Sequence, residues 1–200
     1  MSHVHDPTPS TTLKETRMPT IRTDLVLSAS SESHVIDVPL EKINIGGWLF
    51  ALTDAEYQRC APGDHKAAGT TVSEDGRPMS INVEMIGSGL VVQHYVGEVV
   101  GREYCRMVST SDVLTPGGWT TVQVIWELRA EPAGDGRTRY TNTVTSHPTQ
   151  EFLTFIEERG DTFEDAARAR QAASGAHNAR ETPLFAESIA RASLGSTRTS

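Results

Sequence analysis

Cysteine is scarce in this chain of 200 residues, which contains only Cys60 and Cys105. Neither cysteine belongs to a C-x-x-C pair, and no group of cysteines and histidines has the spacing of a zinc finger. Disulfide-stabilised domains are rich in cysteine, and a structural zinc site needs four ligands. The sequence therefore predicts two reduced thiols in a cytoplasmic protein, with no disulfide framework and no metal site.

The chain also lacks long apolar runs and basic clusters. No stretch approaches the ~20 apolar residues of a membrane-spanning helix, and the first residues lack the basic-then-apolar order of a secretory signal. The 26 acidic residues outnumber the 18 basic ones, which gives a net charge of −8. Because nucleic acids and anionic membranes attract clustered Lys and Arg, we expect neither as a partner, and no membrane insertion.

The familiar motifs of cofactor-dependent and nucleophilic enzymes are missing. The sequence contains no GxGxxG fingerprint, no P-loop, no HExxH helix and no nucleophile elbow. These absences argue against a nucleotide enzyme, a zinc protease of that type and a serine hydrolase. We therefore expect no cofactor.

Strand-type sequence dominates the middle of the chain. Apolar and polar residues alternate there in runs that turn signals separate. The runs cover residues 79–86, 90–100, 104–113, 120–130 and 137–146, and shorter candidates precede them at 21–27, 33–38 and 70–73. Strands joined by tight turns pair antiparallel. The sequence therefore predicts a mainly antiparallel sheet of six or seven strands.

Helix signals flank the strand region on both sides. Pro39 suits the first turn of a helix, although Gly46–Gly47 predicts a break or kink soon afterwards. Thr53-x-x-Glu56 has the form of a capping box for a short second helix. Beyond residue 149, a longer helix is predicted with a capping box at Asp161-x-x-Glu164. That helix is expected to end at Gly175, and Thr182-Pro183 predicts the start of a separate last helix.

Composition divides the chain into three parts. Residues 1–19 are rich in Ser, Thr and Pro and predict a disordered arm, with His3 and His5 as part of a flexible terminus. Residues 20–176 are expected to form one ligand-binding domain of the α+β class. Residues 177–200 are expected to add an extra helix and a frayed tail. A protein-interaction role for that helix, such as a homodimer contact, remains open.

The element order is that of the helix-grip fold, and residues 33–174 resemble the START/Bet v 1-like superfamily, also called the SRPBCC or polyketide cyclase/dehydrase group. The segment VIDVPLEKI looks like its first strand and helix, and ALTDAEYQRCAPG looks like its second helix. The segment VQVIWELRAEPAGDGRTRYTNTV looks like its last hairpin. The resemblance implies a curved antiparallel sheet of six or seven strands wrapped around a long C-terminal helix, with a cavity between them.

The resemblance implies two functions, because this fold hosts both enzymes and carriers. The first is a cofactor-independent enzyme similar to polyketide cyclases and dehydratases, acting on an apolar or aromatic substrate in a hydrophobic cavity. The second is a non-catalytic binding or carrier protein for a lipid or other hydrophobic ligand. In both cases the expected partner is a small hydrophobic molecule.

Two titratable residues on predicted strands are candidates for catalysis. His94 is the first, because it lies in phase with apolar residues and histidine titrates near neutral pH. Glu84 is the second, since burial in a dry cavity would raise the pKa of a carboxylate and make it a better base. The candidates for ligand binding are Trp48, Asn82, Tyr104, Arg106 and Trp126. For each of these residues a purely structural role remains open.

Periodicity also predicts which strand faces line the cavity. Burial of a large apolar side chain gains about 1.5–3 kcal/mol, so we expect the apolar faces of residues 81–85 and 122–128 to point inward. Asn82 and Glu84 would then lie on the solvent face. His94 would be the isolated polar contact in a hydrophobic pocket.

Overall fold

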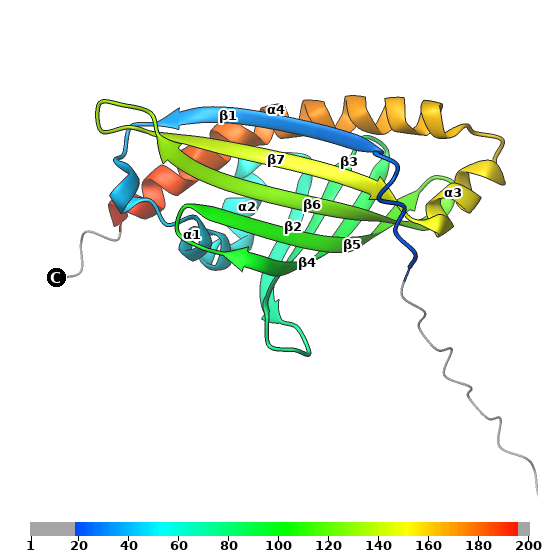
Figure 1. The fold of residues 1–200 in the computed structure, drawn as a ribbon, viewed down its shortest axis with the longest axis horizontal. Coiled ribbons are helices and arrows are strands. Elements are labelled where there is room, and N and C mark those ends of the chain that lie inside the picture. Colours follow the sequence, from blue (N-terminus) through cyan, green and yellow to red (C-terminus); the bar gives the residue numbers. More distant parts are fainter. Residues whose placement is uncertain (1–18, 196–200) are drawn as a thin grey trace, which may run out of the picture.

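The computed structural model describes residues 19–195, and within them a curved sheet packs against a long helix (Figure 1). Residues 1–18 and 196–200 are outside the described residues. The predicted disordered arm, apart from its last residue, and the end of the predicted tail therefore fall outside the description. No helix among residues 19–195 is long and apolar enough to cross a membrane.

The sheet of the described chain has seven strands, each paired antiparallel with its neighbours. They are β1 (Ser28–Ile36), β2 (His65–Val72), β3 (Pro78–Ile86), β4 (Gly89–Val100), β5 (Tyr104–Thr115), β6 (Gly118–Pro132) and β7 (Thr138–Pro148). Their order is β1-β7-β6-β5-β4-β3-β2, so the first strand joins the last at one edge. The predicted antiparallel sheet is confirmed, although the expected strand at 21–27 forms only a single bridge, from Ile21 to Thr149.

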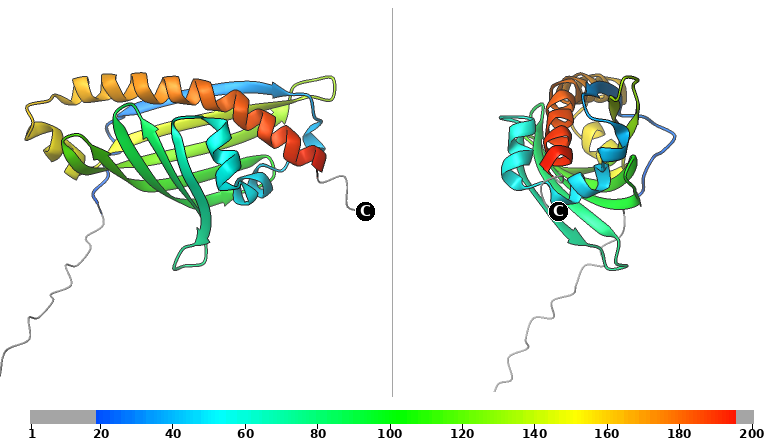
Figure 2. Two further views of the ribbon diagram at one scale, coloured as in Figure 1. Left: turned by 180° about the vertical axis from the view of Figure 1, so that it is seen from behind. Right: turned by 90° about the vertical axis from the view of Figure 1, so that its left-hand side faces the viewer.

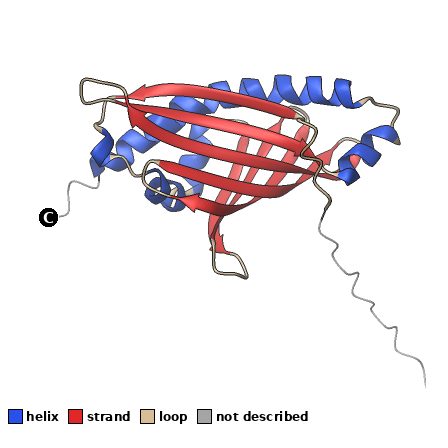
Figure 3. Cartoon of the chain, viewed as in Figure 1, coloured by secondary structure: helices blue, strands red, loops and turns tan. Residues whose placement is uncertain are grey.

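Helices close the concave side of the sheet. The 3₁₀ helix η1 (Leu40–Lys42), α1 (Ile45–Ala51) and α2 (Asp54–Cys60) lie toward one end, and α3 (Gln150–Glu157) lies at the other. The long helix α4 (Phe163–Gly195) runs along the open side between them (Figures 1 and 3). This arrangement is the α+β helix-grip fold that the sequence resemblance implied.

Gly46 and Gly47 lie inside α1 instead of breaking it, contrary to the prediction. The N–H of Gly46 donates to the carbonyl oxygen of Gly101 at 3.0 Å. A Cβ on Gly46 would lie 2.9 Å from that same oxygen. Glycine at this position therefore lets α1 pack directly against the backbone between β4 and β5.

The helix α4 is continuous for 33 residues, so the predicted end at Gly175 and the separate helix from Thr182 are wrong. Pro183 lies inside α4. Proline lacks an N–H and crowds the carbonyl four residues earlier, and such a residue can bend a helix without ending it. In Figure 2, α4 changes direction between its orange and red parts. The predicted extra helix is therefore the second half of the helix that the sheet grips.

The second half of α4 fills one end of the cup. Phe185 and Ile189 are each 1% exposed. The ring of Phe185 meets that of Trp48 edge-on at 5.3 Å between centroids. The indole N–H of Trp48 donates to the hydroxyl of Ser188 at 3.0 Å. Trp48, a predicted ligand-binding residue, thus belongs to the core between α1 and α4.

The buried face of β3 is not the one that the sequence predicted. On β6 the apolar face is buried as expected, with Val122 and Trp126 at 2% and 3% exposure. On β3 the buried face is the polar one, which carries Asn82 and Glu84, and the apolar face of residues 81–85 is only half-buried. The prediction failed because it ignored partners: a polar group is buried at little cost when its atoms are hydrogen-bonded.

Of the two helix caps that the predicted capping boxes imply, one is confirmed and the other is displaced. Thr53 caps α2 by accepting from the N–H of Glu56. Before α4, the cap is Thr162, whose hydroxyl accepts from the N–H of Asp165 at 3.1 Å. The prediction had placed this cap one residue earlier, at Asp161.

Replacing the cap Thr162 with alanine is expected to lower the free energy of unfolding by about 1 kcal/mol, because the N–H of Asp165 loses its acceptor. The matched control is Asp161→Ala, one residue away, which should change stability by less than about 0.5 kcal/mol. Urea unfolding of both variants measures the difference. A larger loss in Asp161→Ala would place the cap where the sequence pattern had put it.

Candidate functional site

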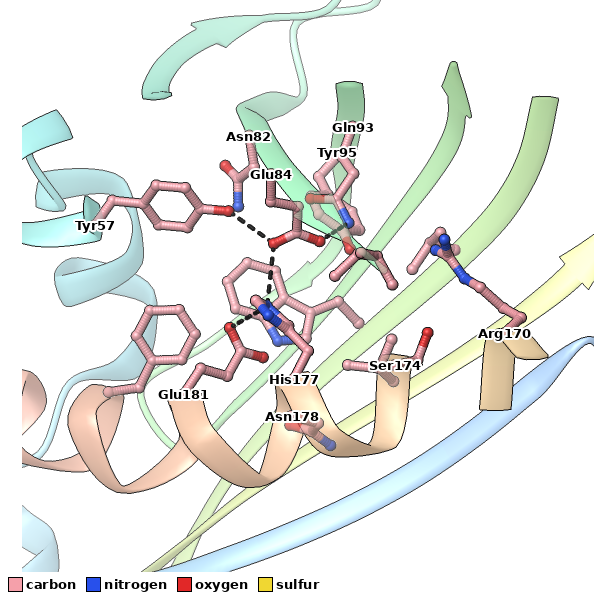
Figure 4. A pocket seen from close by; sticks show the side chains of 15 residues that line it. Tyr57, Asn82, Glu84, Gln93, Tyr95, Arg170, Ser174, His177, Asn178 and Glu181 are labelled. Atoms are coloured by element: carbon pink, nitrogen blue, oxygen red, sulfur yellow. Dashed lines mark hydrogen bonds and ion pairs between the residues drawn. The ribbon is translucent and has the colours of Figure 1, made fainter. Parts of the chain in front are cut away.

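Four titratable side chains converge inside the cup. His65, at the start of β2, pairs in register with Glu84 of β3. His177 and Glu181 are four residues apart, so they share one face of α4. All four residues are buried, and one ligand atom from each lies within 4.8 Å of the others. We call these four residues the His–Glu cluster; Figure 4 shows Glu84, His177 and Glu181 pointing toward one another.

Each histidine of the cluster faces both carboxylates through its Nε2 atom. Nε2 of His65 lies 3.2 Å from Oε2 of Glu181 and 3.5 Å from Oε2 of Glu84. Nε2 of His177 lies 3.3 Å from Oε2 of Glu181 and 3.4 Å from Oε2 of Glu84. Two nitrogens and two oxygens therefore surround one point.

The other nitrogen of each ring is held from outside the cluster. Nδ1 of His65 lies 2.6 Å from the backbone carbonyl oxygen of Tyr57. Nδ1 of His177 lies 3.0 Å from Oδ2 of Asp64. Carbonyl and carboxylate oxygens only accept, so each Nδ1 carries a hydrogen and donates it. These contacts fix both rings with Nε2 directed at the carboxylates.

Amide and phenol groups hold the two carboxylates in place. Gln93 donates to Oε1 of Glu84 at 2.8 Å, and Asn142 donates to Oε1 of Glu181 at 3.0 Å. The hydroxyl of Tyr57 donates to Oε2 of Glu84 at 3.0 Å. Both Oε1 atoms are thereby occupied, and both Oε2 atoms are left facing the histidines.

The charges of the cluster depend on one another. Burial lowers the pKa of His177, but the carboxylates of Glu181 and Glu84 outweigh it and raise that pKa to about 11. Burial raises the pKa of Glu181, whereas His177 and His65 lower it to about 2. Despite this attraction, Nε2 of His177 makes no hydrogen bond to any described residue. A buried polar atom without a partner is rare and needs an explanation.

A cavity of about 30 Å³ adjoins the cluster, enough for about two water molecules. Polar side chains from the sheet and from α4 line it together with aromatic ones; Asn82, Gln93, Tyr95, Trp126 and Ser174 are among them. The prediction of a hydrophobic pocket with one polar contact is therefore wrong for this cavity.

Arg170 of α4 lies between this cavity and a second, apolar cleft, and it lines both. The cleft has a volume of about 300 Å³, and its walls include Leu27, Val113, Val122 and Phe152. Nε of Arg170 is buried and makes no hydrogen bond to any residue that the structure describes. A guanidinium is thus placed at the junction of a polar and an apolar space.

Four of the seven predicted site residues do not line the cavity: Trp48, which packs in the core between α1 and α4, and three residues on the outer face of the sheet, His94, Tyr104 and Arg106. His94 is on the outer face of β4, where Nε2 lies 3.1 Å from Oδ2 of Asp112 and the side chain is 42% exposed. Tyr104 and Arg106 are on the outer face of β5, where both contact Glu127. The roles predicted for these three residues stay predictions, and no contact with the cavity supports them.

Asn82, Glu84 and Trp126 are the predicted site residues that do line the cavity. Sequence reasoning missed His177 and Glu181. Their spacing of four residues would have signalled a shared helix face. The helix end expected at Gly175 removed both residues from the helix before that signal could count.

The chain has a helix-grip fold, the fold that the resemblance to Bet v 1-like proteins implied. No protein-family model and no curated protein matches the sequence. Among solved structures, the chain is similar to the di-domain ARO/CYC StfQ from the steffimycin biosynthetic pathway, with 12% identity and a TM-score of 0.54 over 87% of this chain and 54% of that one. It is also similar to the di-domain ARO/CYC BexL from the BE-7585A biosynthetic pathway, with 11% identity and a TM-score of 0.50 over 82% of this chain and 50% of that one. The chain thus spans about half of each of these proteins, and at such identity the likeness shows the fold alone.

Proposed function

We propose that this protein is an enzyme of the lyase or isomerase type that moves protons on a small substrate with a polar head and an apolar body. The observation that carries the proposal is the buried His–Glu cluster beside a cavity. Buried titratable groups with strongly shifted pKa values gather at functional sites. The similarity in fold to the two ARO/CYC proteins supports cyclase- or dehydratase-type chemistry but does not select a reaction.

Arg170 and the apolar cleft support a substrate of mixed character. A guanidinium whose buried Nε has no hydrogen-bond partner among the described residues favours a carboxylate or similar group from a ligand. The cleft of about 300 Å³ on the other side of Arg170 would take an apolar or aromatic body. We therefore propose an amphipathic substrate whose head lies at the cluster, in place of the apolar or aromatic substrate that the sequence indicated.

A dehydration illustrates what the cluster could do. Glu84 accepts the proton from the carbon next to a carbonyl group, and the electrons of that C–H bond form the new C=C bond. The C–O bond of the β-hydroxyl group breaks at the same time, and the imidazolium of His177 protonates the departing oxygen, so that water is released. The proton on Glu84 then returns to His177 across their 3.4 Å contact.

Turnover of a panel of β-hydroxy ketones bearing a carboxylate tests this proposal, with loss of water followed by mass spectrometry. Glu84→Gln keeps the shape of the side chain and removes the base, so turnover should fall by about 10²–10⁴-fold. His94→Gln, on the outer face, is the matched control and should turn over like the wild type. The opposite result, with His94 essential and Glu84 dispensable, would restore the prediction from sequence.

The apolar cleft also supports a second candidate, a carrier of a hydrophobic ligand. A carrier often keeps its ligand during purification, so native mass spectrometry of the wild type should then show a bound small molecule. Retention of that ligand in Glu84→Gln, with no turnover of any panel member by the wild type, would favour the carrier over the enzyme.

A further inference from the structure

We infer that the His–Glu cluster is a binding site for a divalent transition-metal ion, with Zn²⁺ as the ion that best suits two imidazole and two carboxylate ligands. The ligand atoms are Nε2 of His65 and His177 and Oε2 of Glu84 and Glu181. The binding itself does not depend on the proposed reaction, whereas the use of the ion in catalysis rests on it.

The four nitrogen–oxygen distances inside the cluster are in the range of a tetrahedral site, and all four ligand atoms lie within 4.8 Å of one another. A tetrahedral Zn²⁺ ion has bonds of about 2.0–2.2 Å to nitrogen and oxygen, so its ligand atoms are roughly 3.3–3.5 Å apart. The four nitrogen–oxygen separations in the cluster are 3.2, 3.3, 3.4 and 3.5 Å. The four atoms therefore need little movement to surround an ion.

The residues that hydrogen-bond to the cluster from outside are of the kinds that usually support metal ligands. A metal-binding histidine usually donates its other N–H to a backbone carbonyl or to a carboxylate, which orients the ring. His65 makes the first kind of contact, to Tyr57, and His177 makes the second, to Asp64. Ligating carboxylates are hydrogen-bonded in turn, as Glu84 is by Gln93. The cluster therefore has four ligand side chains and the hydrogen-bond partners that orient them.

Charge and hydrogen bonding agree with an ion at this point. Two buried carboxylates need two positive charges nearby, because an uncompensated buried charge is strongly unfavourable. A divalent ion supplies both charges while each histidine stays neutral. Two imidazolium groups would supply the same charge, but the hydrogen on Nε2 of His177 would then lack an acceptor in line with it. When Nε2 of His177 instead gives its lone pair to a metal ion, the ion is its partner.

The adjoining cavity gives the ion access to a further ligand. A zinc ion with four protein ligands can expand to five-coordinate geometry. The cavity of about 30 Å³ lies against three of the four ligand residues and has room for a water molecule or a substrate oxygen. In the proposed enzyme a bound ion would polarise that oxygen as a Lewis acid, in place of the imidazolium of His177. Nε2 of His177 and Oε2 of Glu84 would then be ligands of the ion, so the proton transfer between them would belong to the metal-free protein alone.

Metal binding by the purified full chain tests the inference without any substrate. The protein is stripped with EDTA, dialysed and titrated with Zn²⁺ against a chromophoric chelator, and bound metal is counted by mass spectrometry. The wild type should bind one ion per chain, and Co²⁺ in its place should show the intense visible absorption of a tetrahedral site. Glu84→Gln combined with Glu181→Gln should weaken binding by at least about 100-fold.

Three further variants make the result specific. Asp64→Asn touches no ligand atom, yet it should weaken binding by about 10–100-fold through His177. Its side chain is partly exposed, so it serves even if the double variant fails to fold. His94→Gln with Asp112→Asn, the outer histidine–carboxylate pair, should bind like the wild type. His3→Ala with His5→Ala controls for binding by the N-terminal histidines and should also match the wild type.

No stoichiometric ion in the wild type would overturn the site, and so would equal binding by the wild type and Asp64→Asn. Failure of the proposed reaction is a separate result, because it appears as absent turnover in a protein that still binds its ion. Turnover that persists unchanged after EDTA treatment would remove the ion from the reaction and leave the imidazolium in its place.

Discussion

Replacing Glu181 with alanine should lower the free energy of unfolding of the EDTA-treated protein by about 3–5 kcal/mol, because it breaks a buried charge network. The change removes the carboxylate that both histidines of the cluster face at 3.2 and 3.3 Å. It also leaves the amide N–H of Asn142 without its acceptor. Urea unfolding followed by circular dichroism measures the loss.

Glu187→Ala is the matched control for this prediction. It changes the same residue type on the same helix, but the side chain of Glu187 is 61% exposed and forms a long ion pair with Arg191, at 3.9 Å. A surface change of this kind should stay within about 0.5 kcal/mol. A loss of less than about 1 kcal/mol in Glu181→Ala would show that the cluster adds little to stability, and the charges assigned to it would be wrong.

Phe185→Ala should also cost about 3–5 kcal/mol, as expected for removal of a buried aromatic ring from a packed core. Phe185 is 1% exposed, and its centroid lies 5.3–6.5 Å from four other rings, those of Trp48, His65, Trp126 and Tyr57. Thermal unfolding of this variant should show a large fall in Tm.

Leu194→Ala tests whether this cost comes from burial or from any apolar change in the second half of α4. Leu194 is 57% exposed, so its replacement should change stability by no more than about 0.5 kcal/mol. Deletion of residues 183–200 should unfold the protein, because it removes Phe185 and Ile189 from the core. A folded, stable truncation would instead support the extra-helix interpretation of the sequence.

The sheet could be predicted because its signals are local. Alternation along a strand and glycine-rich turns between strands depend only on neighbouring residues, as at Gly87-Ser88-Gly89 between β3 and β4. The edge pairing of β1 with β7 joins residues more than 100 positions apart, Ser28 with Ser146 for example. No local signal specifies that pairing, and the sequence analysis did not predict it.

The continuation of α4 beyond Gly175 could not be predicted, since Gly175 and Pro183 are strong local signals against a helix. The helix continues through both because its second half is held by tertiary contacts, such as that of Phe185 with Trp48. Those contacts outweigh the local preferences, which amount to about 1 kcal/mol for glycine and about 3 kcal/mol for proline.

The inward face of β3 was predicted wrongly for a similar reason. A strand that alternates polar and apolar residues usually turns its apolar side to the core. On β3 the polar side is inward because Tyr57, Gln93 and His177 supply partners for Glu84. Those partners come from three different elements, and the sequence alone gives no sign that they meet at one place.

The order in which the chain is synthesised determines when the His–Glu cluster can form. His65 and Glu84 leave the ribosome well before His177 and Glu181, which lie more than 90 positions later in the chain. Until then the polar face of β3 has no helix to cover it, and β1 has no β7 beside it. Domains that depend on contacts between distant segments fold slowly, and their open sheet edges are exposed to aggregation. A nascent chain of this protein can therefore assemble the His–Glu cluster only after α4 has been made.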